Sequence, residues 1–211
     1  DPVRAYHFLD LLHQHGIKAY ALSRQVRIGE QDFLPGESYL VPTQQPQYRL
    51  ITSIFETQTS FTDSLFYDVS TWTLPPAFHL SFAAYRSKTL PAELLGQRAD
   101  RPVFPQGTVR GAANAYAYVF SWDAYYAPRA LYRLLKSGVQ AKVATHPFEA
   151  RIDSGGQRFG YGTVMIPAGG KDGLLRARMD SVARLDGVQV FALETGLSMR
   201  GIDVGSPSFE P

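Results

Sequence analysis

Strands and helices alternate along residues 117–193, and this alternation constrains the fold more than any other feature of the sequence. Apolar and β-branched runs predict four strands, and apolar residues at helical spacing predict two helices between them. The order is strand, helix, strand, strand, helix, strand, over residues 117–120, 128–136, 139–144, 163–166, 174–185 and 188–193. Because such alternation is typical of α/β folds, we expect a mostly parallel sheet with helices on both faces. The strands at 117–120, 139–144 and 188–193 should then be parallel within one sheet.

The first quarter of the chain shows a similar pattern. Apolar residues follow helical spacing from Ala5 to Leu12, and Gly16 suits the end of that helix. Strands are expected at 17–22 and 38–41, and a second helix at 46–56. The segment 4–17, which contains the first helix, resembles residues 129–139, and the segment 38–42 resembles residues 163–167, at a lag of about 125 residues. This resemblance predicts two related helix–strand–strand–helix units, and the alternative is ordinary α/β patterning shared by chance.

These patterns divide the chain into four regions. The first α/β unit covers residues 1–56, an aromatic-rich middle region and connection covers 57–110, and the second α/β unit covers 111–200. Within the connection, residues 91–96 are expected to form one helical turn that stops at a glycine. Residues 201–211 are expected to be a linker to a further domain, so the chain would be a piece of a longer protein.

Composition excludes several function classes. Lys and Arg number 21 against 19 Asp and Glu, which gives no electrostatic argument for nucleic-acid binding. There is no cysteine, so disulfides, thiolate metal sites and cysteine nucleophiles are excluded. No apolar run reaches the 18 or so residues of a membrane-spanning helix, so no membrane partner is expected. The sequence also has no G-x-S-x-G nucleophile motif.

Histidines and glycine-rich loops give only weak site signals. His146 and Glu149 match the HxxE letters of a zinc-peptidase ligand pair, but Pro147 lies between them and no later histidine completes the set. The glycine-rich stretch at 154–162 lacks the features of a phosphate loop and is expected to connect two strands. The stretch at 168–173 follows a strand and precedes a helix, and a plain loop is the favoured interpretation. We therefore expect no metal and no cofactor in this chain.

Residues 61–72 have the densest set of functional side chains in the sequence. The candidate binding residues are Asp63, Tyr67, Asp68 and Trp72, because aromatic rings stack on sugars or peptides and carboxylates accept hydrogen bonds. The alternative, which we favour, is structural: the apolar members of the stretch pack in the core, and its hydroxyl and carboxyl groups cap helices. On this interpretation Trp72 is buried.

The same stretch belongs to a wider resemblance to a known family. The segments that carry it are Pro46–Ile51, Phe55–Glu56, Phe61–Phe78 with the run Asp63-Ser64-Leu65-Phe66-Tyr67-Asp68-Val69-Ser70-Thr71-Trp72-Thr73-Leu74-Pro75, Ala124–Ala144 and Gly201–Phe209. Together they resemble the region after the catalytic domain of large bacterial zinc carboxypeptidases of the M14 type. The last segment looks like the lead-in to the glutamine-amidotransferase-like domain of those proteins.

The resemblance implies a function for the parent protein and a different one for this chain. The parent would be an exported exopeptidase, periplasmic or secreted, with zinc in a catalytic domain that precedes this region. No catalytic or zinc-binding residue of the family maps onto this chain, which would be a non-catalytic accessory domain. Its partners would be the neighbouring catalytic and amidotransferase-like domains. The alternative is an independent binding module for cell-wall glycan or peptide.

Overall fold

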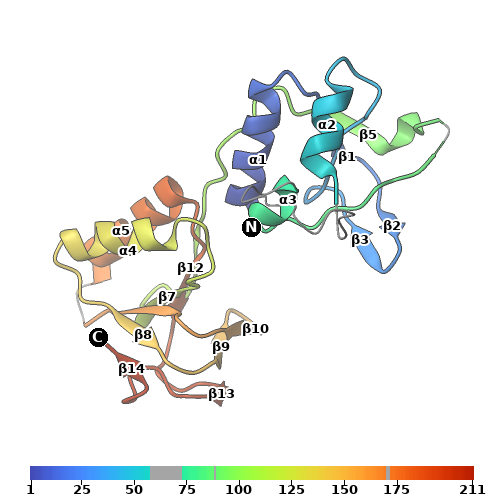
Figure 1. The fold of residues 1–211 in the computed structure, drawn as a ribbon. Helices are drawn as coiled ribbons and strands as arrows, with labels where there is room; N and C mark the ends of the chain where they lie inside the picture. Colours follow the sequence, from blue (N-terminus) through green and yellow to red (C-terminus); the bar gives the residue numbers. More distant parts are fainter. Residues whose placement is uncertain (58–72, 88, 170–171) are drawn as a thin grey trace, which may run out of the picture. The chain divides into compact units, whose positions relative to one another are not determined.

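The computed structural model describes residues 1–57, 73–87, 89–169 and 172–211, and the chain divides into two compact units (Figure 1). The N-terminal unit comprises residues 2–103, and the C-terminal unit comprises residues 104–211 together with Asp1. Each unit has its own hydrophobic core. Among the helices that the structure describes, none is long and apolar enough to cross a lipid bilayer.

The N-terminal unit combines helices with small antiparallel sheets. Its elements are α1 (Pro2–Gln14), β1 (Tyr20–Leu22), β2 (Val26–Ile28), β3 (Gln31–Phe33), β4 (Tyr39–Leu40), α2 (Tyr48–Phe55), α3 (Leu74–Ala77), the 3₁₀ helix η1 (Ala92–Leu94) and β5 (Leu95–Arg98). Strand β1 is central, with β4 and β5 antiparallel on its two sides, and β2 and β3 form a separate hairpin.

Helix α1 has the apolar stripe that the sequence predicts. Phe8 and Leu12 are buried in the core of this unit, and Phe8 packs against Phe55 with ring centroids 5.8 Å apart. Gly16 ends the helix with a φ of 70°, and its N–H donates to the His13 carbonyl at 2.9 Å. The glycine stop expected after residues 91–95 is wrong, because Gly96 lies inside strand β5.

The C-terminal unit contains the stretch from which the fold was predicted. Its elements are β6 (Val109–Gly111), β7 (Ala117–Phe120), α4 (Ala127–Lys136), β8 (Lys142–Ala144), β9 (Phe148–Ile152), β10 (Gly155–Phe159), β11 (Val164–Pro167), α5 (Asp172–Asp186), β12 (Val190–Leu193), β13 (Arg200–Gly201) and β14 (Phe209–Glu210). One sheet has the order β14-β8-β11-β7-β12-β6, and a second has the order β10-β9-β13.

The predicted mostly parallel sheet is wrong. Strands β7, β8 and β12 do share one sheet, but every described pairing in it is antiparallel except that of β12 with β6. The reason is that each helical crossover passes over a strand. Helix α4 connects β7 to β8 with β11 between them, and α5 connects β11 to β12 with β7 between them. This is the split β-α-β arrangement, in which the order of elements matches a parallel fold but neighbouring strands run in opposite directions.

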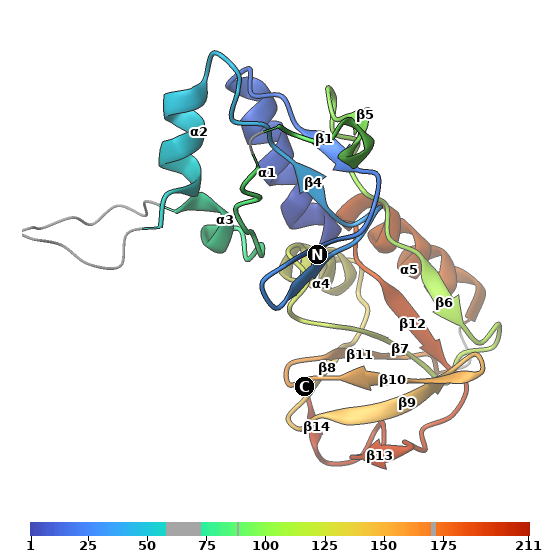
Figure 2. The same ribbon diagram turned by 90° about the vertical axis from the view of Figure 1, so that its right-hand side faces the viewer.

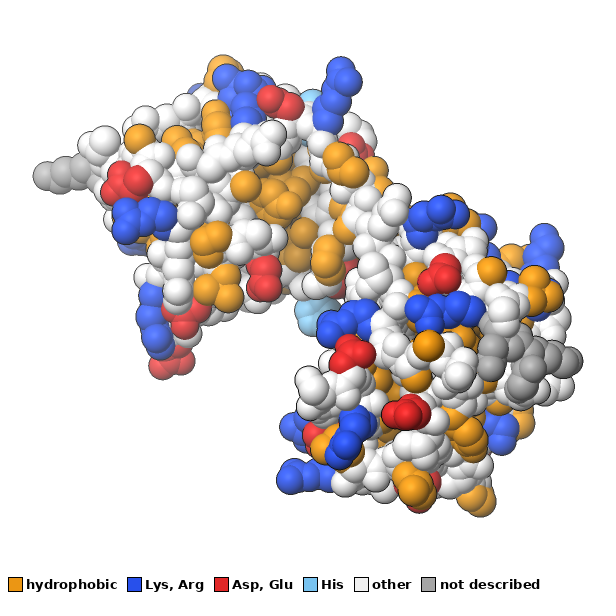
Figure 3. Space-filling model, turned by 180° about the vertical axis from the view of Figure 1, so that it is seen from behind, with side chains coloured by type: hydrophobic (Ala, Val, Ile, Leu, Met, Phe, Trp, Pro, Cys, Tyr) orange, Lys and Arg blue, Asp and Glu red, His pale blue; other side chains and the backbone are white. Residues whose placement is uncertain are grey.

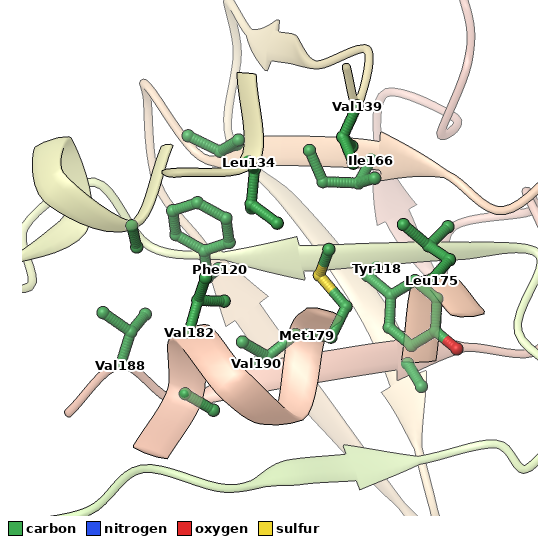
Figure 4. Close-up of a cluster of buried hydrophobic side chains, with 14 of the residues drawn as sticks. Tyr118, Phe120, Leu134, Val139, Ile166, Leu175, Met179, Val182, Val188 and Val190 are labelled. Carbon is green, nitrogen blue, oxygen red and sulfur yellow. The ribbon is translucent and has the colours of Figure 1, made fainter. Parts of the chain in front are cut away.

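Helices cover one face of the six-stranded sheet, which corrects the expectation of helices on both faces. Tyr118 and Phe120 of β7 pack with Met179 and Val182 of α5 and with residues of α4 (Figure 4). Ala117 and Val119 alternate with Tyr118 and Phe120 along β7. They belong to a second cluster, formed with the β10-β9-β13 sheet. Strand β7 is therefore buried on both faces, and its continuous apolar run reflects this second sheet rather than a second helical layer.

An ion network joins the two helices of this unit. Asp186, the last residue of α5, is fully buried, and its Oδ1 accepts a hydrogen bond from Arg129 Nε at 2.5 Å. Arg133 Nε lies 3.3 Å from the other carboxylate oxygen. The two arginines are four residues apart on α4 and so lie on the same face of that helix. They supply the positive charge that a buried carboxylate requires.

Candidate functional site

The predicted binding residues Asp63, Tyr67, Asp68 and Trp72 lie outside the residues that the structure describes. Their role as a sugar- or peptide-binding segment, or as a buried structural segment, stays a prediction.

The HxxE letters at His146–Glu149 do not fit a zinc site. His146 is exposed before β9, whereas Glu149 lies within that strand. Its carboxylate is 4.0 Å from Arg200 Nε, and His146 Nδ1 is 3.1 Å from the hydroxyl of Thr145. A helical HxxE motif places both ligands on one face, but positions three apart on extended chain point to opposite sides. Within the described ranges, no group of three or more metal-ligating side chains lies close enough to hold an ion.

Two adjoining hollows in the C-terminal unit form an open concave surface, which we call the edge groove. Their volumes are about 280 and 390 Å³. The first is lined by Ala150, Arg151, Leu193, Glu194, Thr195, Leu197, Ser198 and Met199. The second is lined by Gly111, Ala112, Ala113, Asn114, Arg151, Asp153, Ala192 and Glu194. Arg151 and Glu194 line both hollows.

The fold brings these residues together where three strands end. Strands β6 and β12 are parallel, so their carboxyl ends lie at the same edge of the sheet. Figure 2 shows that this edge lies beside the hairpin formed by β9 and β10. Alternation along β9 buries Phe148, Ala150 and Ile152 and directs Arg151 outward. The groove is therefore walled by the outer side of β9, the ends of β6 and β12, and the segment after β12.

The segment after β12 is held in place by its own hydrogen bonds. Val204 N–H donates to the Gly196 carbonyl at 2.8 Å, and Ser198 N–H donates to Asp203 Oδ1 at 2.8 Å. The ring of Tyr116 lies so close to Gly196 that a Cβ there would be 2.9 Å from it. Because backbone and ring fix this segment, Leu197 and Met199 are held at the groove while 72% and 49% exposed.

Charges of both signs line the groove. Among the residues that the structure describes, no ion pair involves Arg151 or Glu194, and both side chains are exposed. Asp153 pairs with Arg110 at 3.6 Å, and both of those side chains are more than half exposed, so the pair contributes little to stability. Acidic and basic side chains are also interspersed over the face of the protein seen in Figure 3. Arg151 and Glu194 are thus available to a ligand that carries either charge.

A second surface carries exposed aromatic side chains. It lies at the other edge of the six-stranded sheet, at the strand ends opposite the edge groove. Trp122 follows β7, Tyr161 precedes β11 and His146 follows β8, and all three are exposed. His146 and Tyr161 have ring centroids 6.4 Å apart. Trp122 packs against Gly162, whose added Cβ would lie 3.2 Å from the Trp122 Cβ. Exposed rings of this kind offer flat apolar area to a ligand.

The sequence pointed to neither surface. The glycine-rich stretch at 154–162 was expected to connect strands, and it supplies β10 after a turn at Asp153, whose φ is 53°. The stretch at 168–173 is only partly described. The one sequence signal for the groove is the run Leu197-Ser198-Met199, which places two large apolar residues just after a predicted strand. Comparison of the chain with protein-family models, curated proteins and solved structures found no match.

Proposed function

We propose that this chain is a non-catalytic accessory domain of a zinc carboxypeptidase-like protein, and that its edge groove holds the peptide that the parent cleaves. The observation that carries the proposal is the groove itself. It presents an exposed arginine, an exposed glutamate and two exposed apolar side chains, and strand ends form its walls. A peptide carries the same three kinds of group, so the groove is chemically suited to it.

The sequence resemblance is the support for the proposed parent. The segments at 124–144 and 201–209 that resemble the carboxypeptidase family form α4, β8 and the strand β14 within the C-terminal unit. A guiding role requires peptide binding but no chemistry in this chain. It is the simplest role that accommodates both the resemblance and the groove.

The proposal is tested in the parent protein. The sequence upstream of Asp1 is expected to contain an HxxE pair and a later histidine. In that enzyme, the paired change Arg151→Ala and Glu194→Gln should raise KM for peptide substrates several-fold and leave kcat unchanged, because the groove binds substrate and transition state equally. Tyr132→Ala, an exposed site on α4, is the matched control. An unchanged KM, or an upstream sequence without the zinc ligands, would refute the proposal.

The alternative is an independent module that binds cell-wall glycan. Its specific support in the described residues is the aromatic surface of Trp122, His146 and Tyr161. Titration with a soluble peptidoglycan fragment should then quench Trp122 fluorescence, and Tyr161→Ala should weaken the binding. On the accessory-domain proposal neither effect is expected.

A further inference from the structure

Strand β9 carries main-chain groups that face the edge groove. In an antiparallel strand the N–H and C=O of one residue point to the same side, and successive residues alternate. The Glu149 carbonyl faces β13, because it accepts a hydrogen bond from Met199 N–H at 2.7 Å. Arg151, two residues further along β9, therefore directs its own N–H and C=O to that same side, away from β10.

Strand β13 ends before it reaches Arg151. Its pairing with β9 covers Gly201 opposite Phe148 and Arg200 opposite Glu149. Met199 also bonds to Glu149, so two successive residues stand opposite one, as in a β-bulge. The residues that precede Met199 do not pair with β9, and the first hollow of the groove occupies the space beside Ala150 and Arg151. In the described part of the chain, no hydrogen bond of the Arg151 main chain is found on this side.

We infer that an extended peptide binds in the edge groove by adding a strand to β9, through the N–H and C=O of Arg151. This inference rests on the proposed function and specifies how the peptide is held. A residue that offers one donor and one acceptor on the same side of a strand is complementary to the backbone of another strand.

The side chains of the groove define which peptide fits. Leu197 and Met199 form an apolar wall, and Arg151 and Glu194 stand at the junction of the two hollows. The volume of about 280 Å³ lies just below the roughly 300–1,000 Å³ of ligand sites, so the hollow suits a short segment and not a folded partner. The favoured ligand is an extended peptide with an apolar residue for the wall and an acidic residue for Arg151.

The test is a scan of N-methylated peptides. The probe is an acetylated and amidated octapeptide of alternating valine and threonine with one central aspartate, titrated into the ¹⁵N-labelled chain. Because the Arg151 carbonyl is the one acceptor through which the inference holds the peptide, methylation of the single peptide amide that faces it should weaken binding at least tenfold, and methylation of either neighbouring amide should change it less than twofold. Met199→Ala should weaken binding without changing this pattern, whereas Tyr132→Ala should have no effect.

Three results would overturn the inference: no single amide whose methylation weakens binding tenfold, no binding at millimolar peptide, or self-association of the chain through this edge. Each outcome is separate from the outcome in the parent enzyme. A KM effect without a single sensitive amide would leave the guiding function standing and refute strand addition. A single sensitive amide without a KM effect would support strand addition and refute the guiding function.

Discussion

Loss of Arg129 should destabilise the C-terminal unit, because this side chain compensates a buried charge. Asp186 is fully buried at the carboxyl end of α5, where the helix dipole is itself negative, so its charge requires the arginines of α4. Arg129→Ala removes the hydrogen bond to Asp186, and a hydrogen bond to a charged group contributes about 1.5–3 kcal/mol. It also removes the contact with the Tyr126 ring, whose centroid is 3.5 Å from the guanidinium carbon, about 0.5–1 kcal/mol.

Solvent lowers the loss of stability expected for Arg129→Ala. Because the Arg129 side chain is 38% exposed, water screens part of the interaction, and we expect Arg129→Ala to cost about 2–3 kcal/mol. Arg133 is 3.3 Å from the carboxylate and 46% exposed, so Arg133→Ala should cost about 0.5–1 kcal/mol. The variant that lacks both arginines leaves an unpaired buried carboxylate and should lose about 3–5 kcal/mol.

Urea unfolding followed by Trp122 fluorescence measures these differences. The chain has two tryptophans, so a Trp72→Phe background makes Trp122 the only reporter, and Trp122 lies in the C-terminal unit. A double-mutant cycle with Asp186→Asn isolates the pair. In that background Arg129→Ala should cost less than about 1 kcal/mol, because only the Tyr126 and Leu185 contacts remain. Equal costs in both backgrounds would refute the charge-compensation argument.

Three further predictions concern other parts of the chain. Gly111→Ala should cost about 2–4 kcal/mol, because Gly111 has a φ of 102° and an added Cβ would lie 2.3 Å from the Ala192 carbonyl oxygen. Gly155→Ala is its control, since no atom lies within 4 Å of an added Cβ there, and it should leave the denaturation midpoint unchanged. Trp72→Ala should cost roughly 3–5 kcal/mol if the ring is fully buried, and a thermal melt equal to that of the parent chain would favour a binding role. The purified chain should hold no stoichiometric zinc and should release no C-terminal residues from peptides. Elemental analysis tests the first expectation and a carboxypeptidase assay tests the second. One zinc per chain, or released C-terminal residues, would contradict the prediction.

The sequence was sufficient to place six elements between residues 117 and 193, but it did not predict β9 and β10 and did not reveal how the strands pair. Strand β7, helix α4 and helix α5 lie within a few residues of their expected positions, because apolar spacing reports which residues are buried. The parallel pairing was wrong because element order does not reveal whether a crossover passes over another strand. The apolar run at 117–120 looked like a strand between two helical layers, whereas a three-stranded sheet covers its second face.

The edge groove could not be predicted because it depends on where strand pairing stops. Arg151 is exposed on β9. The pairing of β13 with β9 reaches only to Glu149, so the main chain of Arg151 faces the groove. Glu194 and Met199 come to this position through the turn after β12, which is set by tertiary hydrogen bonds. The predicted site at 63–72 was proposed from residue types alone, and those residues lie outside the described part of the chain.

Hydrogen exchange at the Arg151 amide tests the central claim most directly. In the free chain this amide should exchange rapidly, because it faces the groove and no acceptor for it is found among the described residues, while the Ala150 amide on the β10 side should be protected. At saturating concentration of the valine–threonine octapeptide, exchange at Arg151 should slow at least tenfold and exchange at Ala150 should be unchanged. Protection of Arg151 in the free chain, or unchanged exchange at Arg151 when the peptide is bound, would contradict strand addition in the edge groove.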